Sequence, residues 1–417
     1  MKNVLAEIIV IGDEILYGQK LDTNSHWISG ELDKIGVRVI RVTAVGDWED
    51  QILAAFEEAE SRAQVVLITG GLGPTSDDLT KPCLAKYFNT GLSMNDEVLK
   101  DVTAYLKSKG REMTELNRNQ ALFPDGGRAI RNKNGTAPGI WMERNGKIFI
   151  SMPGVPREMK EMMRREILPS LQSRFQTLVI YHKIVNTVGI GESWLADAIR
   201  GWEEALPKFI RLAYLPSPGF VKLRLTATGD DMEAVKQAVD IQVENLKKLV
   251  GGYIYGYDNA LLEEEVGKTL VSLNKTAAFA ESCSGGYLSH LITTIPGCSE
   301  YFKGSIVCYH NDVKVKTLGV KKETLAAHGA VSEQTVREMA ENVRKILEAD
   351  FGVAVSGIAG PGGGTAEKPV GTVWIALADE SQTIAKKLQL GDDRLINIRL
   401  SAVNALNLLR QRLNQKL

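Results

Sequence analysis

A chain of 417 residues, 44% of them hydrophobic, is long enough for about two to four domains with packed cores. Its formal charge of −1 gives no electrostatic reason to expect nucleic acid or an anionic membrane as a partner. No stretch has the pattern of a transmembrane helix or a cleavable signal, and the four cysteines are too irregularly spaced for a disulfide framework or a zinc site. We therefore expect a soluble, cytoplasmic protein.

The first part of the chain, about residues 1–170, alternates strands and helices. Buried strands are predicted at 6–11, 37–42 and 65–68, with a helix at about 24–34 between the first two strands. This alternation predicts an α/β domain with a parallel sheet, and such sheets bind ligands beyond the carboxyl ends of their strands.

Two glycine-rich loops follow these strands. The first strand runs into GDE at 12–14, and the third runs into TGGLGPTSDD at 69–78. The backbone amides of such loops bind phosphate oxygens, and Asp13, Asp77 and Asp78 offer the oxygen ligands that a hard divalent cation prefers. A single loop of this kind is better explained by turns and helix caps, but two at equivalent strand ends favour nucleotide binding.

Four motifs in this part resemble the molybdopterin-binding-like domain of the CinA (competence/damage-inducible protein A) family. They are GDEILYG at 12–18, TGGLGPTSDD at 69–78, NGTAPG at 134–139 and SMPGVPREM at 151–159. The resemblance implies an ADP-ribose pyrophosphatase that depends on a divalent metal (Mg, Mn or Co), which Asp13, Asp77 and Asp78 would hold. In the alternative hypothesis, this domain only binds a nucleotide or pterin as a regulatory module. The candidate nucleotide-binding residues are Gly12, Asp13, Glu14, Asn24, Thr69, Gly70, Gly71, Gly73, Thr75, Pro153 and Gly154.

The middle segment, residues 171–252, is predicted to be a small α+β domain. Its expected strands lie at 177–181, 183–188, 209–215 and 220–228, and its expected helices lie at about 192–202 and 231–249. Residues 251–256 read as an exit linker that can add a strand.

The corresponding region of the CinA family is KH-like, and KH domains grip nucleic acid with a GxxG loop between helices. This chain instead has GIGE at 189–192, entering a helix from a strand, and it has no basic stripe. We therefore expect a structural or dimer-forming spacer, and the family resemblance implies a homodimer. The same two observations argue against a DNA-associated role for the protein.

The C-terminal part, residues 258–417, is predicted to form a second α/β domain with a mixed sheet. Its expected strands lie at 276–280, 304–309, 352–356, 373–377 and 382–390, and its expected helices lie at 261–270, 287–295, 333–348 and from about 394.

The hexapeptide ESCSGG at 281–286 joins a predicted strand to a predicted helix. Its two glycines allow a ligand to approach the backbone, and we expect the first amides of the helix to point outward without partners. Such an end can stabilise an oxyanion, and a serine beside it is suited to act as a nucleophile. The hexapeptide alone fits equally well with a serine that only caps the helix.

Five motifs together resemble the C-terminal nicotinamide mononucleotide deamidase domain of the CinA family, so that the resemblance spans the whole chain. They are ESCSGG, YHNDVK at 309–314, AHGAVS at 327–332, SGIAGPGGG at 356–364 and KPVGTVW at 368–374. The resemblance implies catalysis by Ser282, Tyr309 and Lys314. It also implies hydrolysis of nicotinamide mononucleotide to nicotinate mononucleotide and ammonia, without a metal or other cofactor.

In this hypothesis Ser282 attacks the carboxamide and Tyr309 relays or orients the proton. Lys314 is the base if burial and nearby positive charge lower its pKa. Without the resemblance, a lysine five residues after a strand end is ordinarily an exposed charge. Cys283 is intrinsically the better nucleophile, but the resemblance selects Ser282. Amides near Ser284 and Gly285 and in the 357–364 loop are candidates for the oxyanion hole, and Arg394 and Arg399 are candidate phosphate ligands. The full set of candidate substrate-binding residues is Ser284, Gly285, Gly286, Asn311, Gly357, Ala359, Gly360, Arg394 and Arg399.

Overall fold

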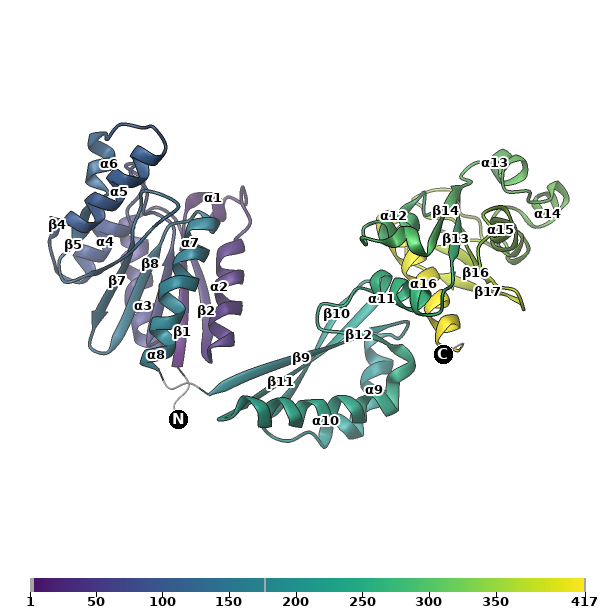
Figure 1. Ribbon diagram of the computed structural model, residues 1–417, viewed down its shortest axis with the longest axis horizontal. Helices are drawn as coiled ribbons and strands as arrows, with labels where there is room; N and C mark the ends of the chain where they lie inside the picture. The colour runs from purple at the N-terminus through teal and green to yellow at the C-terminus, as the bar shows by residue number, and fades with distance from the viewer. Residues whose placement is uncertain (1–3, 176–177, 416–417) are drawn as a thin grey trace. The chain divides into compact units, whose positions relative to one another are not determined.

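The computed structural model describes residues 4–175 and 178–415 (Figure 1). The chain divides into two compact units, one of residues 1–181 with 228–236 and one of residues 182–227 with 237–417. Residue 177, which was predicted to be extended, and the outermost residues of the first and third predicted domains lie outside the described residues. None of the described helices is long and apolar enough to cross a membrane.

The first domain is a six-stranded sheet with helices on both faces (Figure 1). Its strands are β1 (Val4–Ile11), β2 (Val37–Val45), β3 (Val65–Thr69), β6 (Arg128–Ile130), β7 (Gly139–Arg144) and β8 (Lys147–Met152), and β4 (Leu92–Met94) pairs separately with β5 (Leu122–Pro124). Its helices are α1 (Asp13–Leu16), α2 (Thr23–Lys34), α3 (Glu49–Arg62), α4 (Thr80–Tyr87), α5 (Asp96–Ser108), α6 (Glu115–Asn119), α7 (Pro156–Met162), the π-helical segment η1 (Met163–Ile167) and α8 (Leu168–Arg174).

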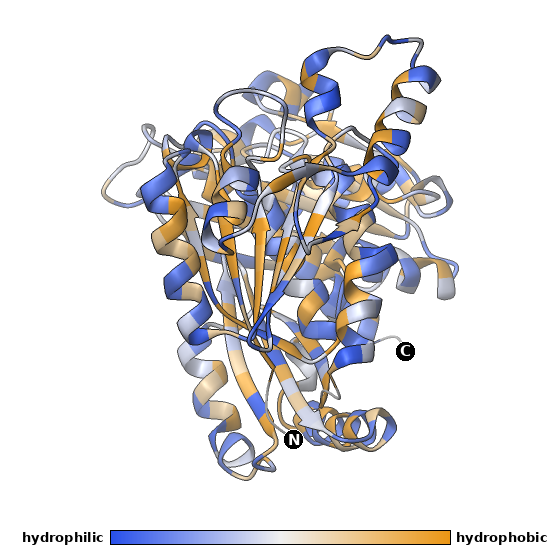
Figure 2. Cartoon of the chain, turned by 90° about the vertical axis from the view of Figure 1, so that its left-hand side faces the viewer, coloured by the Kyte–Doolittle hydropathy of each residue, from blue (hydrophilic) through white to orange (hydrophobic). Residues whose placement is uncertain are grey.

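The sheet has the order β2-β1-β3-β8-β7-β6. Its first four strands are parallel, which confirms the predicted α/β architecture, and β7 and β6 add an antiparallel edge. Successive residues of β1 and β3 face opposite cores, because strand side chains alternate between the two faces. Ile8 and Leu67 pack with α2, α7 and α8, whereas Ile9 and Ile68 pack with α3, α4 and α5. In Figure 2 these strands are largely orange, whereas the helices carry both colours.

The middle domain is a four-stranded sheet of order β10-β11-β9-β12 with two helices. Its elements are β9 (Val179–Val188), α9 (Glu192–Glu204), β10 (Ile210–Ser217), β11 (Phe220–Gly229), α10 (Met232–Val250), the 3-10 turn η2 (Gly251–Tyr253) and β12 (Ile254–Tyr257). The predicted α+β character is therefore confirmed, and the two expected strands at 177–181 and 183–188 form one described strand. The exit linker supplies β12, which pairs with β9 in antiparallel fashion.

The third domain is a five-stranded mixed sheet of order β14-β13-β15-β16-β17 (Figure 1). Its strands are β13 (Ala277–Glu281), β14 (Phe302–Val307), β15 (Phe351–Gly357), β16 (Thr372–Ala378) and β17 (Thr383–Gln389). Its helices are α11 (Leu262–Ser272), α12 (Tyr287–Thr293), the 3-10 turn η3 (Cys298–Glu300), α13 (Asn311–Lys316), α14 (Lys322–His328), α15 (Glu333–Ile346) and α16 (Arg394–Asn414).

Two helical layers cover this sheet. Phe279 of β13 faces α11, α12 and α16, whereas its neighbours Ala278 and Ala280 face α15. The small alanines allow α15 to pack closely on β13. β14, β13 and β15 are mutually parallel, so their carboxyl ends lie at the same edge, where β13 delivers Ser282.

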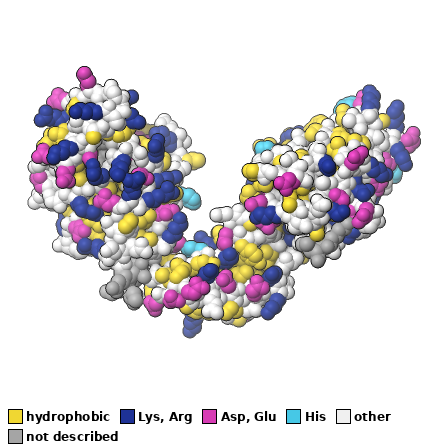
Figure 3. All heavy atoms as spheres, viewed as in Figure 1, with side chains coloured by type: hydrophobic (Ala, Val, Ile, Leu, Met, Phe, Trp, Pro, Cys, Tyr) yellow, Lys and Arg dark blue, Asp and Glu magenta, His cyan; other side chains and the backbone are white. Residues whose placement is uncertain are grey.

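Acidic and basic side chains are interspersed on the face shown in Figure 3, in keeping with the net charge of −1.

Candidate active sites

Ser282 follows the last residue of β13, in a tight turn that leads into α12. Its amide donates a hydrogen bond to the Val355 carbonyl at 2.9 Å, and its own carbonyl accepts one from the Gly285 amide at 3.1 Å. Gly285 and Gly286 have φ angles of 60° and 101°, a region that glycine adopts without strain. The turn therefore fixes the backbone of Ser282. The residue is 8% exposed.

Lys314 lies beside the Ser282 hydroxyl. It belongs to α13, it is 1% exposed, and its Nζ lies 3.0 Å from Ser282 Oγ. The same Nζ donates to the carbonyls of Cys308 at 2.7 Å and Tyr309 at 3.3 Å. Burial lowers the pKa of Lys314 without the help of a neighbouring cation. A lysine held in this way against a serine hydroxyl can act as its general base.

Tyr309 has a different position from the one expected. Its side chain is 59% exposed, and its hydroxyl accepts a hydrogen bond at 3.0 Å from Nη2 of Arg394. Nη1 of Arg394 donates to the Gly360 carbonyl at 2.6 Å. Within residues 4–175 and 178–415, no hydrogen bond joins the Tyr309 hydroxyl to Ser282 or Lys314. The structure therefore places Tyr309 with Arg394 at the edge of the site.

We expected the first amides of α12 to point outward without partners, but the structure shows that they have one. The fully buried carboxylate of Glu281 accepts hydrogen bonds from the amides of Gly286, Leu288 and Ser289 at 2.9–3.0 Å. It also accepts from the Ser289 hydroxyl. The expectation was wrong because a carboxylate satisfies helix amides better than the small turn residues alone. An oxyanion would have to be stabilised elsewhere.

The other oxyanion candidates differ in their surroundings. The Gly285 amide is used within the turn, whereas the Ser284 hydroxyl is buried and has no hydrogen-bond partner among the described residues. In the 357–364 loop, added Cβ atoms on Gly357 and Gly360 would lie 2.6 Å and 2.7 Å from valine side chains. Close packing therefore accounts for these two glycines. The Ser284 hydroxyl has unused hydrogen-bonding capacity, but it is enclosed by the protein.

Cys283 is unsuited to act as the nucleophile. Its side chain belongs to the core beneath α12 and α16, and its thiol contacts Ser401. Burial raises the pKa of the thiol to about 12, so almost none of it is thiolate at neutral pH.

Several remaining candidates lie at the surface. Asn311 and Arg399 are exposed, and Arg399 lies five residues after Arg394, about 140° around the helix.

Two buried residues, Glu281 and Asn397, were missed in the sequence analysis. The side-chain amide of Asn397 donates to the carbonyls of Ala359 at 3.0 Å and Gly391 at 2.9 Å. A charged residue directly after an apolar strand was the available signal for Glu281, whereas Asn397 gave none.

The first domain has a cavity of about 830 Å³ at the carboxyl ends of β1, β3 and β8. The candidates Gly12, Glu14, Asn24, Thr69, Gly70, Gly71, Gly73, Pro153 and Gly154 line it together with Asp77 and Asp78, whereas Asp13 and Thr75 are not part of its lining. An added Cβ on Gly70 would lie 2.0 Å from the Ile11 carbonyl, so only glycine allows these two loops to approach.

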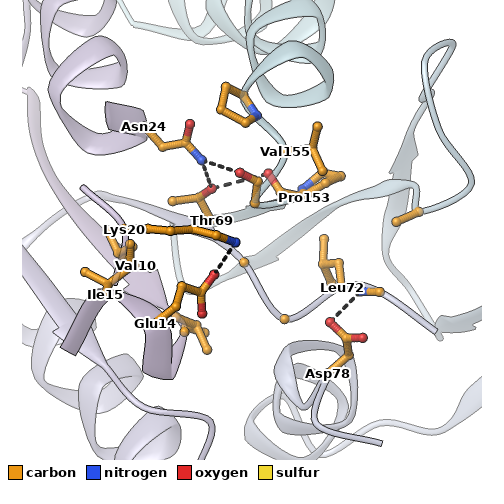
Figure 4. Close-up of a pocket in the computed structure, with 18 of the residues that line it drawn as sticks. Val10, Glu14, Ile15, Lys20, Asn24, Thr69, Leu72, Asp78, Pro153 and Val155 are labelled. Atoms are coloured by element: carbon orange, nitrogen blue, oxygen red, sulfur yellow. Dashed lines mark hydrogen bonds and ion pairs between the residues drawn. The ribbon is translucent and has the colours of Figure 1, made fainter. Parts of the chain in front are cut away.

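Asn24 joins three of the segments around this cavity (Figure 4). Its Nδ2 donates to Thr69 Oγ1 at 3.1 Å and to the Gly154 carbonyl at 2.8 Å, and Thr69 Oγ1 donates to the Pro153 carbonyl at 3.3 Å. The buried Oδ1 of Asn24 has no partner among the described residues. The amide of Asn24 therefore ties α2 to the two loops at the carboxyl ends of β3 and β8.

The residues present do not fit the expected divalent metal. The Asp78 carboxylate is occupied by the amides of Gly73 and Thr75 and by the Thr75 hydroxyl. Among the described residues, no three His, Cys, Asp or Glu side chains converge in a way that could hold a metal ion. Burial raises the pKa of Asp47, and the carboxylates of Asp13, Glu14 and Asp77 act in the same direction.

Three family models together match nearly the whole chain. They are described as a probable molybdopterin binding domain (residues 7–173), a damage-inducible protein CinA KH domain (182–256) and a CinA C-terminal domain (259–413). They correspond to the first, middle and third domains.

Full-length relatives agree with these models. A CinA-like protein of Cytophaga hutchinsonii is 50% identical and covers 99% of both chains, and another from Amoebophilus asiaticus is 45% identical over 98% of this chain and 99% of its own. A crystal structure of a competence/damage inducible protein from Agrobacterium tumefaciens is 39% identical over 37% of this chain and 98% of its own, with a TM-score of 0.35. With the three domains in this order and such relatives over its length, the chain belongs to the CinA family.

Proposed function

We propose that the third domain hydrolyses nicotinamide mononucleotide to nicotinate mononucleotide and ammonia. The observation that carries the proposal is the contact of Lys314 Nζ with Ser282 Oγ at 3.0 Å, in a site where burial lowers the lysine pKa. Burying a lysine costs stability, and groups whose pKa is shifted by burial are concentrated at functional sites. Acyl transfer from an amide to water is the chemistry that a serine and a neutral lysine perform.

The reaction runs in two halves. Neutral Lys314 takes the Ser282 proton as Oγ bonds to the carboxamide carbon, and the resulting ammonium returns a proton to the nitrogen, which leaves as ammonia. Water then attacks the acyl-serine ester and gives its proton to Lys314, and that proton returns to Ser282 as the acid is released.

The phosphate of this substrate would bind at Arg394 rather than at Arg399. The guanidinium of Arg394 is held by Gly360 and Tyr309, so its remaining N–H groups have a fixed direction. In this proposal, Tyr309 positions Arg394 and closes one edge of the substrate site.

The test is ammonia release from nicotinamide mononucleotide in the presence of a chelator. We expect wild type to be active, Ser282→Ala to lose at least about a thousandfold, and Thr293→Ala, an exposed hydroxyl on the same helix α12, to match wild type. Absence of ammonia from folded wild type, or full activity in Ser282→Ala, would overturn the proposal.

A second proposal concerns the first domain, whose cavity of about 830 Å³, lined by the glycine-rich loop that follows β3, favours a nucleotide such as ADP-ribose as ligand. Because the acidic residues do not form a metal site, the observations support a nucleotide- or pterin-binding module more than a metal-dependent pyrophosphatase. AMP release from ADP-ribose, with and without a divalent cation, distinguishes the two. Asp78→Ala is a poor probe, since it also removes the loop hydrogen bonds of Gly73 and Thr75.

A further inference from the structure

A basic groove lies on the first domain beside the nucleotide cavity. Arg157, Lys160 and Arg164 line it together with Asn134, Pro156 and Glu161, and its volume is about 490 Å³. Figure 3 shows a group of Lys and Arg side chains over α7. The three cations recur at intervals of three and four residues along α7 and η1, so they share one helix face.

These three cations are not neutralised by the protein. None of them forms an ion pair with a described carboxylate, whereas the adjacent Arg165 pairs with Glu161. Three like charges on one helix face repel one another and gain from an anion between them. An uncompensated basic cluster in a chain of net charge −1 is therefore a local feature that calls for an anionic ligand.

The ring of Trp27, on α2, supports two of the cations. Lys160 Nζ lies 5.5 Å and Arg164 Cζ 5.2 Å from its centroid. Cation–π contacts limit the motion of long side chains and leave their N–H groups available for other acceptors. The groove is thus partly ordered before any ligand binds.

The groove and the cavity are neighbours, because Pro156 lines both. Glu14, Asp47 and Asp77 line what we call the acidic side of the cavity, where Lys20 pairs with Glu14. Glu158 of α7 lines the cavity as well, and its carboxylate accepts a hydrogen bond from Asn132. The groove holds three cations against one carboxylate, so a phosphate is attracted to the groove more strongly than to the carboxylates of the cavity. A ribose hydroxyl, by contrast, can donate to a carboxylate.

We propose that Arg157, Lys160 and Arg164 bind a phosphate group of the nucleotide whose nucleoside part occupies the cavity. The inference rests on the proposed nucleotide site and adds the orientation of its ligand. The phosphates lie toward α7, and the sugar hydroxyls lie toward the acidic side.

The experiment measures binding of inorganic pyrophosphate, ADP-ribose and adenosine to the full chain by calorimetry. The variant is Arg157→Gln/Arg164→Gln, and the matched control is Arg111→Gln/Arg118→Gln, which removes two exposed arginines of the first domain that line neither the groove nor the cavity. We expect the double variant to weaken ADP-ribose and pyrophosphate about tenfold, leave adenosine unchanged, and lose much of the salt dependence of binding. The control should bind all three probes as wild type does.

Equal binding of both phosphate probes by wild type and the double variant would overturn the inference, as would a wild type that binds neither. If pyrophosphate binding is lost in the double variant but wild type binds neither ADP-ribose nor adenosine, the nucleotide site fails and the anion groove stands. A mixed-sequence DNA duplex that needs the same arginines, when pyrophosphate binding does not, would assign the groove to nucleic acid and contradict the proposal.

Discussion

Lys314 and Lys316 lie two residues apart on α13 and have opposite surroundings. Lys314 is 1% exposed and contacts Ser282, whereas the Lys316 side chain is 76% exposed and lies 3.8 Å from Asp312. Both lysines belong to the same short helix, so the difference in their chemistry comes from their burial and contacts. A substitution of Lys316 removes one positive charge from α13 without touching Ser282, and it is therefore a control for substitutions of Lys314.

The role of Lys314 as base predicts a rise of activity with pH. Only the neutral amine accepts a proton, and burial places the pKa of Lys314 below its ordinary value of 10.5. We expect kcat/KM for nicotinamide mononucleotide to increase about tenfold per pH unit and to level off at an apparent pKa below 10.5. Lys316→Met should keep this profile. A flat profile in wild type would exclude Lys314 as the base.

The same depressed pKa affects stability. Below the folded-state pKa the native protein must bury an ammonium, and this cost disappears as pH rises toward the unfolded-state value. Lys314→Met should therefore abolish activity, and its thermal stability relative to wild type should fall as pH rises toward 10.5, because wild type gains stability over that range whereas methionine does not titrate. The carbonyls of Cys308 and Tyr309 lose a donor in this variant at every pH. A difference in stability that does not change with pH would contradict the depressed pKa.

The residues alone left Ser282 as either a helix cap or a nucleophile, and the family resemblance selected it together with Lys314; the burial of Lys314 did not follow from its own segment. The strand, the small-residue turn and the helix around Ser282 follow from hydrophobic periodicity. The segment NDVKVK, in contrast, has too few apolar residues to indicate a helix, and its burial depends on β13 and β14. Contacts between distant segments decided the surroundings of the lysine.

At the scale of elements, Glu281 connects the end of β13 to the start of α12. A carboxylate that accepts three backbone amides holds the helix at a fixed angle to the strand, and the nucleophile lies between the two. The α12 end that was predicted as an anion site is therefore already filled by an anion of the chain itself.

Removal of this carboxylate should disturb both stability and catalysis. We expect Glu281→Ala to lower the free energy of unfolding by about 2–4 kcal/mol, because three amides lose a charged acceptor inside the protein. Urea unfolding and kcat measure the two effects. Ser305→Ala is the graded control, since its hydroxyl reaches the same carboxylate only at 3.5 Å and should cost under about 1 kcal/mol. If Glu281→Ala were as stable as Ser305→Ala, the carboxylate would not hold α12.

Several elements of the third domain were predicted from the residues, whereas many elements of the first domain were not. The strands β13, β15 and β16 and the helix α15 have clear apolar periodicity, and Ser332 caps α15. The missed elements include α3 and α5, two long helices whose buried residues do recur at helical spacing. They also include the short helices α13 and α14, which are stabilised by tertiary packing rather than by their own sequence patterns.

Across the larger compact unit, α16 joins the middle and third domains. The buried guanidinium of Arg410 donates to the carbonyls of Ile254 at 2.8 Å and Gly252 at 2.7 Å, in the segment predicted to be a linker. An added Cβ on Gly189 would lie 2.6 Å from Asn407, so the glycine loop of the KH-like domain also packs on α16. This contact accounts for Gly189 without nucleic acid, and an added Cβ on Gly191 would lie 2.7 Å from Trp194.

Arg410→Met therefore tests whether the two domains unfold as one unit. The methionine keeps the apolar stem, but the carbonyls of Gly252 and Ile254 lose their donor, so we expect a loss of about 2–4 kcal/mol in the free energy of unfolding. We also expect faster proteolysis at 252–258 under native conditions, because β12 loses part of its anchor. Gln411→Ala, an exposed neighbour, is the matched control and should show neither effect. Unchanged proteolysis together with an unchanged urea midpoint in Arg410→Met would mean that packing alone joins the domains.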